Sequence, residues 1–156
     1  MPDLYVFDTS AIVAFTDQEE GADEIERLLN AARANTCRIE ACALSLMELY
    51  YVALQEAGED EAAKLVALVK SWPMVWIYPD ERILLQAGKI KATYRLSVAD
   101  ALIAAVAKLR SATLVHKDPE LKALAPEVTL LNLPLKKKTG RKRRKFVRAE
   151  TSSPGT

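Results

Sequence analysis

Four acidic residues of this 156-residue chain lie where a hydrophobic segment ends or an apolar helical pattern begins. Asp8 and Asp118 follow short apolar runs, and Glu48 and Asp100 fall in the first turns of apolar helical patterns. Carboxylates are costly to gather in a partly buried cleft unless positive charge holds them together, so a converging set of acids indicates a site for hard divalent cations. The four positions therefore suggest one shared metal site.

Helix capping is the alternative interpretation of the same acids. Ser45 and Ser97 each precede an acid by three residues, which is the spacing of a capping box. Asp118 comes directly before Pro119, as an N-cap residue does when proline opens a helix, and Asp8 could cap the segment that follows it. Capping alone would explain each acid taken singly. All four acids at one edge of a sheet would favour a cation site, because independent caps have no reason to meet there.

Short β-type runs alternate with helical patterns along the chain. The expected strands are residues 4–7, 37–44, 75–77, 113–116 and 129–133. The expected helices are a stretch beginning at residues 10–15, followed by residues 22–34, 45–57, 59–72, 80–94 and 98–109. Because parallel neighbours need crossovers of this length, the order predicts an α/β fold, a single domain whose central, mostly parallel, five-stranded sheet is flanked by helices. Ligands of such sheets bind beyond the carboxyl ends of the strands, where Asp8 and Asp118 are expected.

Two groups of apolar residues bear on packing and on partners. The helix at residues 80–94 is expected to bury Ile83, Leu84, Ala87 and Ile90. The helices at residues 45–57 and 59–72 carry more apolar residues than one core-facing stripe requires, namely Leu46, Leu49, Tyr50, Val52, Leu65, Val66, Leu68 and Val69. These residues indicate either an exposed groove or dimer surface, or a wider core.

The length and the hydrophobic fraction of 50% fit one domain with its own core, which we place at residues 1–135. No apolar run reaches the ~18 residues of a membrane helix and no secretory signal opens the chain, so the expected location is the cytoplasm. Cys37 and Cys42 are the two cysteines. Their odd separation places them on opposite faces if both lie in one strand, so they cannot bridge each other.

The net charge of +1 hides a division between the two ends of the chain. Residues 1–135 hold 13 Lys and Arg against 20 Asp and Glu, a net charge of −7, whereas residues 136–156 hold 9 basic residues and 1 acid, a net charge of +8. The basic tail is too charged to pack and is expected to be disordered when alone. Its candidate nucleic-acid-binding residues are Lys136, Lys137, Lys138, Arg141, Lys142, Arg143, Arg144 and Lys145. The alternative is a tail that serves solubility alone.

Four segments of the chain together resemble the PIN-domain nucleases, and in particular the VapC-type toxins of toxin-antitoxin pairs. They are residues 5–11 (YVFDTSA), 45–49 (SLMEL), 99–105 (ADALIAA) and 113–121 (TLVHKDPEL). The resemblance covers residues 3–133. It implies that Asp8, Glu48, Asp100 and Asp118 form the catalytic acidic pocket for Mg²⁺ or Mn²⁺, with Ser10 and Glu120 in support. His116 departs from the pattern, since a Thr or Ser is common at that position. We expect it to play a structural role at a strand end, with contact to a phosphate as the alternative.

The resemblance implies a metal-dependent endoribonuclease that hydrolyses RNA phosphodiester bonds, acting as a toxin. It further implies an antitoxin partner and a homodimer, with no membrane association. Candidate cations for RNA binding in the body are Lys89, Lys91, Arg95, Lys117 and Lys122, although a solvated helix face is the better interpretation of the first three. Two rival functions remain open. One is a PIN-type RNA-processing nuclease without an antitoxin, and the other is a non-catalytic nucleic-acid-binding module.

Overall fold

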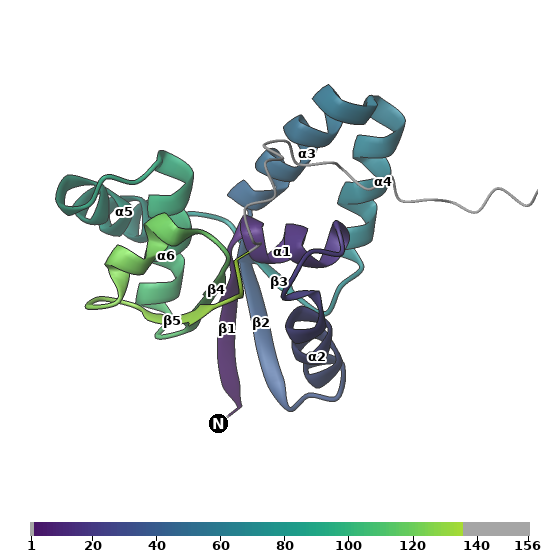
Figure 1. Ribbon diagram of the computed structural model, residues 1–156. Coiled ribbons are helices and arrows are strands. Elements are labelled where there is room, and N and C mark those ends of the chain that lie inside the picture. Colours follow the sequence, from purple (N-terminus) through teal and green to yellow (C-terminus); the bar gives the residue numbers. More distant parts are fainter. Residues whose placement is uncertain (1, 136–156) are drawn as a thin grey trace, which may run out of the picture.

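Five short strands form the centre of the fold, with helices on both sides (Figure 1). The computed structural model describes residues 2–135, so the predicted basic tail lies outside the described residues. The strands are β1 (Asp3–Phe7), β2 (Cys37–Cys42), β3 (Val75–Ile77), β4 (Thr113–His116) and β5 (Thr129–Asn132). The helices are α1 (Thr9–Thr16), α2 (Ala22–Arg33), α3 (Leu44–Ala57), α4 (Glu59–Lys70), α5 (Glu81–Thr93), α6 (Val98–Leu109) and the 3₁₀ helix η1 (Pro119–Leu124).

The strands pair in the order β3-β2-β1-β4-β5, and every pairing in this sheet is parallel. This confirms the predicted α/β fold with a five-stranded, largely parallel sheet flanked by helices. The chain builds outward from β1 through β2 to β3 and then returns to place β4 on the other side of β1. The boundary between β1 and β4 is therefore the switch point of the sheet, where ligands of open α/β folds bind beyond the strand ends.

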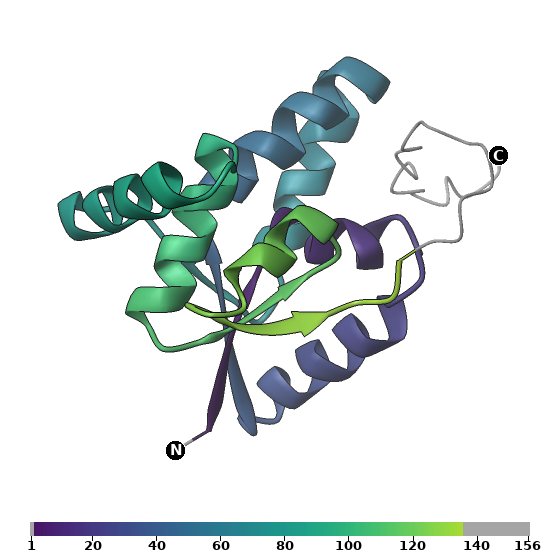
Figure 2. The ribbon, with the colours of Figure 1, turned by 60° about the vertical axis from the view of Figure 1, so that its left-hand side comes forward.

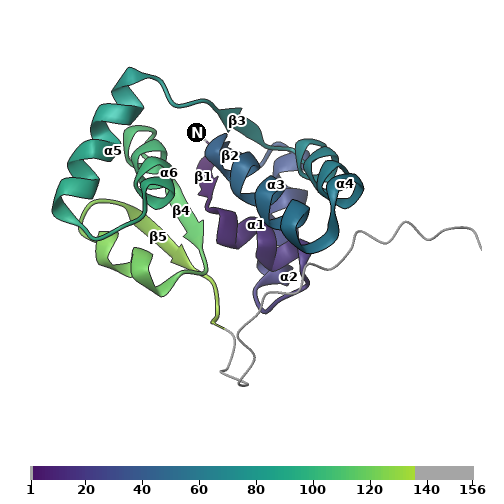
Figure 3. The same cartoon turned by 90° about the horizontal axis from the view of Figure 1, so that it is seen from above.

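The two faces of the sheet carry separate hydrophobic cores. Viewed from above, α1 to α4 lie on one side of the strands and α5 and α6 on the other (Figure 3). Cys37 belongs to the core beneath α1 to α4 and Cys42 to the core beneath α5 and α6, and both cysteines are free. The prediction that they point to opposite faces and cannot bridge is confirmed.

The helix ends follow ordinary capping chemistry. Asp80 caps α5 by accepting a hydrogen bond from the backbone N–H of Ile83 at 2.9 Å, and Ser97 caps α6 through the N–H of Asp100 at 3.1 Å. Gly58 ends α3 with a φ of 87°, a left-handed value that glycine adopts without strain. These contacts account for the helix boundaries falling within about two residues of the predicted ones.

One packing prediction is wrong. Leu84 is 53% exposed, whereas Ile83, Ala87 and Ile90 are buried as expected. The helix α5 packs mainly against α6, so only residues spaced three and four apart along one stripe reach the core. Leu84 lies one position round the helix from that stripe. Within residues 2–135, none of the helices is long and apolar enough to cross a membrane.

Candidate metal centre

The sheet topology places all four predicted acids at its carboxyl edge. Asp8 directly follows β1 and Asp118 follows β4, and these strands are neighbours in the sheet. The backbone N–H of Asp8 donates to the carbonyl of Val115 at 2.9 Å, which extends the β1–β4 ladder to the edge. Glu48 lies early in α3, which leaves this edge after β2, and Asp100 lies in the first turn of α6, which leads back towards β4. The switch point therefore has acids on both of its sides.

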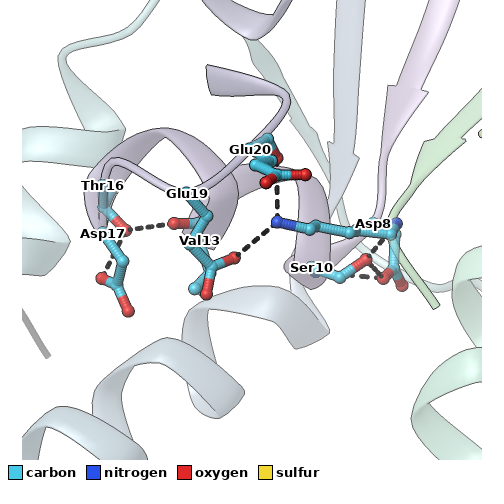
Figure 4. Close-up of polar contacts among 8 residues, drawn as sticks. Asp8, Ser10, Val13, Thr16, Asp17, Glu19 and Glu20 are labelled. Carbon is cyan, nitrogen blue, oxygen red and sulfur yellow. Dashed lines mark hydrogen bonds and ion pairs between the residues drawn. The ribbon is translucent and has the colours of Figure 1, made fainter. Parts of the chain in front are cut away.

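Asp8 is buried, with a relative exposure of 3%, and its two oxygens have different surroundings. Oδ2 accepts from the backbone N–H of Ser10 at 3.0 Å and from the Ser10 hydroxyl, so Asp8 caps α1 (Figure 4). Oδ1 is buried and has no hydrogen-bond partner among the described residues. Burial raises the pKa of Asp8 to about 6, the Ser10 hydrogen bonds oppose the rise, and the charges of Glu48 and Asp118 add to it.

Three acids gather on the other side of the switch point. Asp100, Asp118 and Glu120 each offer a carboxylate oxygen, and these oxygens all lie within 4.8 Å of one another. Burial raises the pKa of Asp100 to about 6, with further contributions from the charges of Asp8 and Asp118. The charge of Asp8 thus acts on the pKa of Asp100, although Asp8 and Glu48 are not part of this group of three.

Glu48 is held by a pair of buried hydroxyls. The Thr9 hydroxyl donates to Oε1 of Glu48 at 2.6 Å and contacts the Ser45 hydroxyl at 2.8 Å. Because Thr9 donates its proton to Glu48, Ser45 is the donor to Thr9. The interpretation of Ser45 as a helix cap is wrong, since α3 begins at Leu44 without a side-chain cap and Ser45 is fully buried. No local pattern indicates that Ser45 faces Thr9, which lies 36 residues away along the chain.

Asp8 and Asp118 are helix caps as well as members of the predicted acid set. Asp118 caps η1 through a hydrogen bond from the backbone N–H of Glu120 to Oδ1 at 2.9 Å, with proline opening the helix as predicted. Asp8 and Asp118 therefore each use one oxygen on a helix end. The N-termini of α1 and α6 contribute positive dipole ends near the acids, which partly offsets the repulsion among the carboxylates. The grouped side chains of Asp100, Asp118 and Glu120 offer only oxygen donors, which suit hard cations such as Mg²⁺, Mn²⁺ or Ca²⁺.

A model of a known protein family matches most of the described chain. The family model described as the PIN domain matches residues 5–126. This chain belongs to the PIN domain family. Membership places it in a group of nucleases and confirms the resemblance seen in the four sequence segments. No curated protein sequence matches the chain.

Solved structures show the same PIN fold at low sequence identity. VapBC2 from Rickettsia felis, bound to a DNA fragment from its promoter, has a TM-score of 0.68 and 20% identity, covering 84% of this chain and 99% of that chain. DNA-bound VapBC from Salmonella typhimurium has a TM-score of 0.68 and 20% identity, and the match covers 85% of this chain and 98% of that chain. VapC20 from Mycobacterium tuberculosis is a toxin that cleaves the Sarcin-Ricin loop. It has a TM-score of 0.59 and 18% identity, and the match covers 76% of this chain and 93% of that chain.

His116, the residue that departs from the PIN pattern, supports the turn before η1. It is buried at the end of β4, and its Nδ1 accepts a hydrogen bond from the backbone N–H of Asp118 at 3.1 Å. Burial lowers the pKa of His116, which keeps the imidazole neutral and Nδ1 able to accept. The expectation of a structural role at a strand end is confirmed, and the contact ties His116 to the backbone of Asp118.

The side chain of Lys117 has partners within this PIN domain. Its side chain is only 8% exposed, and its ammonium group donates to the carbonyl of Glu20 at 2.8 Å and lies 3.5 Å from Oε1 of Glu19. Lys117 is one of the candidate cations for RNA binding, and the structure instead pairs its ammonium group within the fold. Lys91 also has a partner, since it donates to the carbonyl of Leu96 at 2.9 Å.

Proposed function

We propose that this chain is a divalent-metal-dependent endoribonuclease and the toxin of a toxin-antitoxin pair. The observation that carries the metal is the buried Oδ1 of Asp8, which has no hydrogen-bond partner among residues 2–135. A buried polar atom without a partner is costly, and an ion at this position would satisfy it. Family membership supports the nuclease, and the all-oxygen donor set supports Mg²⁺ or Mn²⁺.

Each residue has a distinct part in this proposal. Asp8 and Asp100 bind the ion directly, while Glu48 and Asp118 bind it directly or through water. Ser10 fixes the rotamer of Asp8, and Glu120 completes the group around Asp118. When bound, the ion supplies positive charge beside the scissile phosphate and acidifies water for in-line attack. The reaction hydrolyses an RNA phosphodiester, leaves a 5′-phosphate and a 3′-hydroxyl, and uses no protein nucleophile.

The proposed protein partner binds along α3 and α4. Five large hydrophobic residues of these helices are between 37% and 54% exposed, namely Met47, Tyr50, Tyr51, Leu54 and Leu68. An apolar surface of this kind is typical of a protein interface. An antitoxin segment and a second copy of the chain are the partners that the VapC resemblance implies, and the named VapBC complexes support the first of them.

Substrate affinity is assigned to the basic tail. Residues 1–135 carry a net charge of −7, whereas residues 136–156 carry a net charge of +8. We propose that these residues bind RNA through its phosphates, independently of sequence.

The decisive test compares acid-to-amide variants in RNA cleavage. Asp8→Asn and Asp100→Asn should each lower Mn²⁺-dependent cleavage by at least about 100-fold, since even outer-shell changes cost metal sites 10- to 100-fold. Asp80→Asn is the matched control because Asp80 also caps a helix but lies outside the acid group, and it should cleave like the wild type. The measurement is the initial rate on total RNA with and without Mn²⁺, with the ends of the products mapped.

The outcome separates the rival functions. Full activity in both acid variants would remove the metal assignment. Absence of Mn²⁺ binding by calorimetry would favour the non-catalytic binding module. Cleavage without growth arrest on expression in cells, or arrest that no neighbouring small gene product relieves, would favour an RNA-processing nuclease without an antitoxin.

A further inference from the structure

Lys117 is a basic residue next to the acidic site in the chain, and it contacts two separate parts of the fold, the start of α1 and the turn that follows α1. We propose that Lys117 is a positioning residue of the metal centre, which straps the segment carrying Asp118 and Glu120 to both ends of α1. The inference rests on the proposed function, because the property that it assigns to Lys117 is control of metal affinity.

The backbone of Lys117 is linked to Asp8. Its N–H donates to the Ser10 hydroxyl at 2.8 Å, and that hydroxyl donates in turn to Oδ2 of Asp8. The Ser10 hydroxyl therefore accepts from one side of the switch point and donates to the other. These two consecutive hydrogen bonds fix the position of the Lys117 backbone relative to the start of α1.

The side chain of Lys117 reaches the turn beyond the other end of α1. Figure 4 shows Glu19 and Glu20 between Asp8 and Ser10 on the right and Thr16 and Asp17 on the left. The ammonium group donates to the Glu20 carbonyl at 2.8 Å and lies 3.5 Å from the Glu19 carboxylate, whose side chain is 26% exposed. A buried ammonium group without these partners would suffer a large desolvation penalty, so the contacts hold the side chain in one conformation.

The turn that receives Lys117 is itself fixed. Gln18 and Gly21 have left-handed φ values of 51° and 96°, and the N–H of Glu19 donates to the carbonyl of Ala14 at 2.8 Å. Leu133, just after β5, packs so close to Gly21 that a Cβ added there would lie 3.2 Å from its own Cβ. Figure 2 shows the end of β5 running up to the connection between α1 and α2. The Glu20 carbonyl is thus a rigid anchor for the lysine.

Lys117 therefore connects the turn after α1 to the segment that carries two of the acids. Asp118 and Glu120 follow Lys117 closely in the chain, and Asp118 also raises the pKa of Asp8 by its charge. If the strap is released, the Asp118 and Glu120 carboxylates are no longer held at a fixed distance from Asp8. Metal affinity should fall, because a divalent ion requires its oxygen ligands to be held together in advance.

The test uses the full-length chain with Lys117→Met, which keeps the length and apolar stem of the side chain but removes the ammonium group. We expect the Kd for Mn²⁺, measured by calorimetry, to rise about 10-fold, in the range seen for supporting residues of metal sites. The kcat should recover at saturating Mn²⁺, with KM for RNA unchanged. Lys117→Arg should restore the Mn²⁺ affinity to within about 3-fold, since it keeps a cation that can donate to the same carbonyl.

Two further variants keep the test decisive. Lys108→Met is the matched control, because Lys108 pairs with Glu127 at 2.6 Å in the last turn of α6, away from the acids, and its removal should leave the Mn²⁺ affinity unchanged. Gly21→Ala leaves Lys117 intact but disturbs its anchor, through strain at a φ of 96° and contact with Leu133, so it should also raise the Kd for Mn²⁺. This second route remains informative if Lys117→Met folds poorly.

Failure of the strap differs measurably from failure of the metal site. A wild-type chain that neither binds Mn²⁺ nor cleaves RNA would overturn the proposed function. A wild type that binds Mn²⁺, with the same Kd in Lys117→Met and Gly21→Ala, would overturn the strap alone. A raised KM for RNA and a weaker salt dependence in Lys117→Met, at unchanged Mn²⁺ affinity, would return Lys117 to the role of phosphate contact.

Discussion

At the scale of single residues, the acids of this PIN domain show that a helix cap and a candidate metal ligand can be one side chain. A carboxylate has two oxygens, and Asp8 gives Oδ2 to the start of α1 while Oδ1 is left without a partner among the described residues. Asp118 likewise gives Oδ1 to η1. Capping and metal binding are alternatives only if each acid has a single role, and the geometry allows both at once.

The pKa of Asp8 leads to a prediction about stability and pH. Its value rises from 3.8 to about 6 in the folded chain, so the folded state binds a proton more readily than the unfolded state. Stability of the metal-free chain must therefore fall as the pH rises from about 4 through about 6, and then level off. Asparagine is uncharged, so Asp8→Asn removes the cost of burying an ionised carboxylate. The substitution should raise the free energy of unfolding by up to about 3 kcal/mol at pH 7.5 and by little at pH 4.

Thermal or urea unfolding in EDTA at the two pH values measures this effect. Adding Mn²⁺ at pH 7.5 should stabilise the wild type and leave Asp8→Asn unchanged, because the ion binds only the ionised site. An Asp8→Asn variant that is less stable than the wild type at pH 7.5 in EDTA would show that the ionised carboxylate stabilises the fold on its own.

The acids could be predicted from the sequence, but the groups that orient them could not. Asp8, Glu48, Asp100 and Asp118 stand out in short local patterns, and these patterns depend on neighbouring residues only. The Thr9–Ser45 contact spans 36 residues and the Lys117–Glu20 contact spans 97, and side-chain contacts at such separations leave no periodic signal. For this reason local pattern predicts a cap at Ser45, which is wrong, and does not reveal that the ammonium group of Lys117 has partners inside the fold.

At the scale of elements, the parallel sheet itself explains why the acids meet. A helix that follows a parallel strand begins at the carboxyl edge, so the caps of α1 and η1 must fall there whatever their function. The expectation that independent caps have no reason to share this edge is therefore too strong. Two features distinguish a metal site from a set of independent helix caps. Carboxylate oxygens of Asp100, Asp118 and Glu120 lie within 4.8 Å of one another, and Asp8 is buried.

Hydrophobic pattern predicts every strand and every α-helix in residues 2–135, with boundaries within about two residues. It does not show η1, because a 3₁₀ helix of 6 residues is too short to show a repeat, and the Asp118-Pro119 cap is the only sign of this helix in the sequence. It also misses the burial of Glu40, whose carboxylate pairs with Arg110 across 70 residues. A lone acid within an otherwise buried strand is the available sign of such a pair.

The Glu40–Arg110 pair gives a prediction for the link between β2 and the end of α6. Glu40 is 1% exposed and Arg110 39%, and Arg38 reaches Glu40 only at 4.0 Å. Removing the arginine leaves a buried carboxylate nearly uncompensated, so Arg110→Met should lower the free energy of unfolding by about 3 kcal/mol. The double variant Glu40→Met, Arg110→Met should recover most of this stability.

Urea unfolding of the single and double variants checks this pair. Mn²⁺ affinity should stay unchanged in both, because Arg110 follows the last turn of α6 and Asp100 lies in its first. Equal stability of Arg110→Met and the wild type would mean that water reaches Glu40 and that the pair contributes little.

At the scale of the whole molecule, charge divides the chain into an acidic body and a basic tail. The body carries −7 and residues 136–156 carry +8. An acidic body repels RNA at long range, so a nuclease built on it needs a separate source of positive charge. The tail lies outside the described residues, and its role stays a prediction.

Deleting residues 136–156 should weaken RNA binding and flatten its dependence on salt. For each phosphate that the tail no longer neutralises, the slope of log affinity against log salt should become shallower by about 0.7 for a single strand. The kcat at saturating RNA should stay the same, because the acids remain in place. Fluorescence anisotropy at several salt concentrations provides the measurement, and an unchanged affinity and slope would assign the tail to solubility or to a protein partner.

Binding of a divalent ion by the acids at the switch point underlies the proposed nuclease, and anomalous diffraction from crystals soaked in Mn²⁺ would reveal such an ion directly. We expect an anomalous peak at the carboxyl edge, within about 2.5 Å of an oxygen of Asp8 or Asp100 and close to Asp118. The same peak should be absent from Asp8→Asn crystals. Crystals of an active preparation that bind Mn²⁺ elsewhere, or leave this edge without a peak at saturating Mn²⁺, would contradict the assignment.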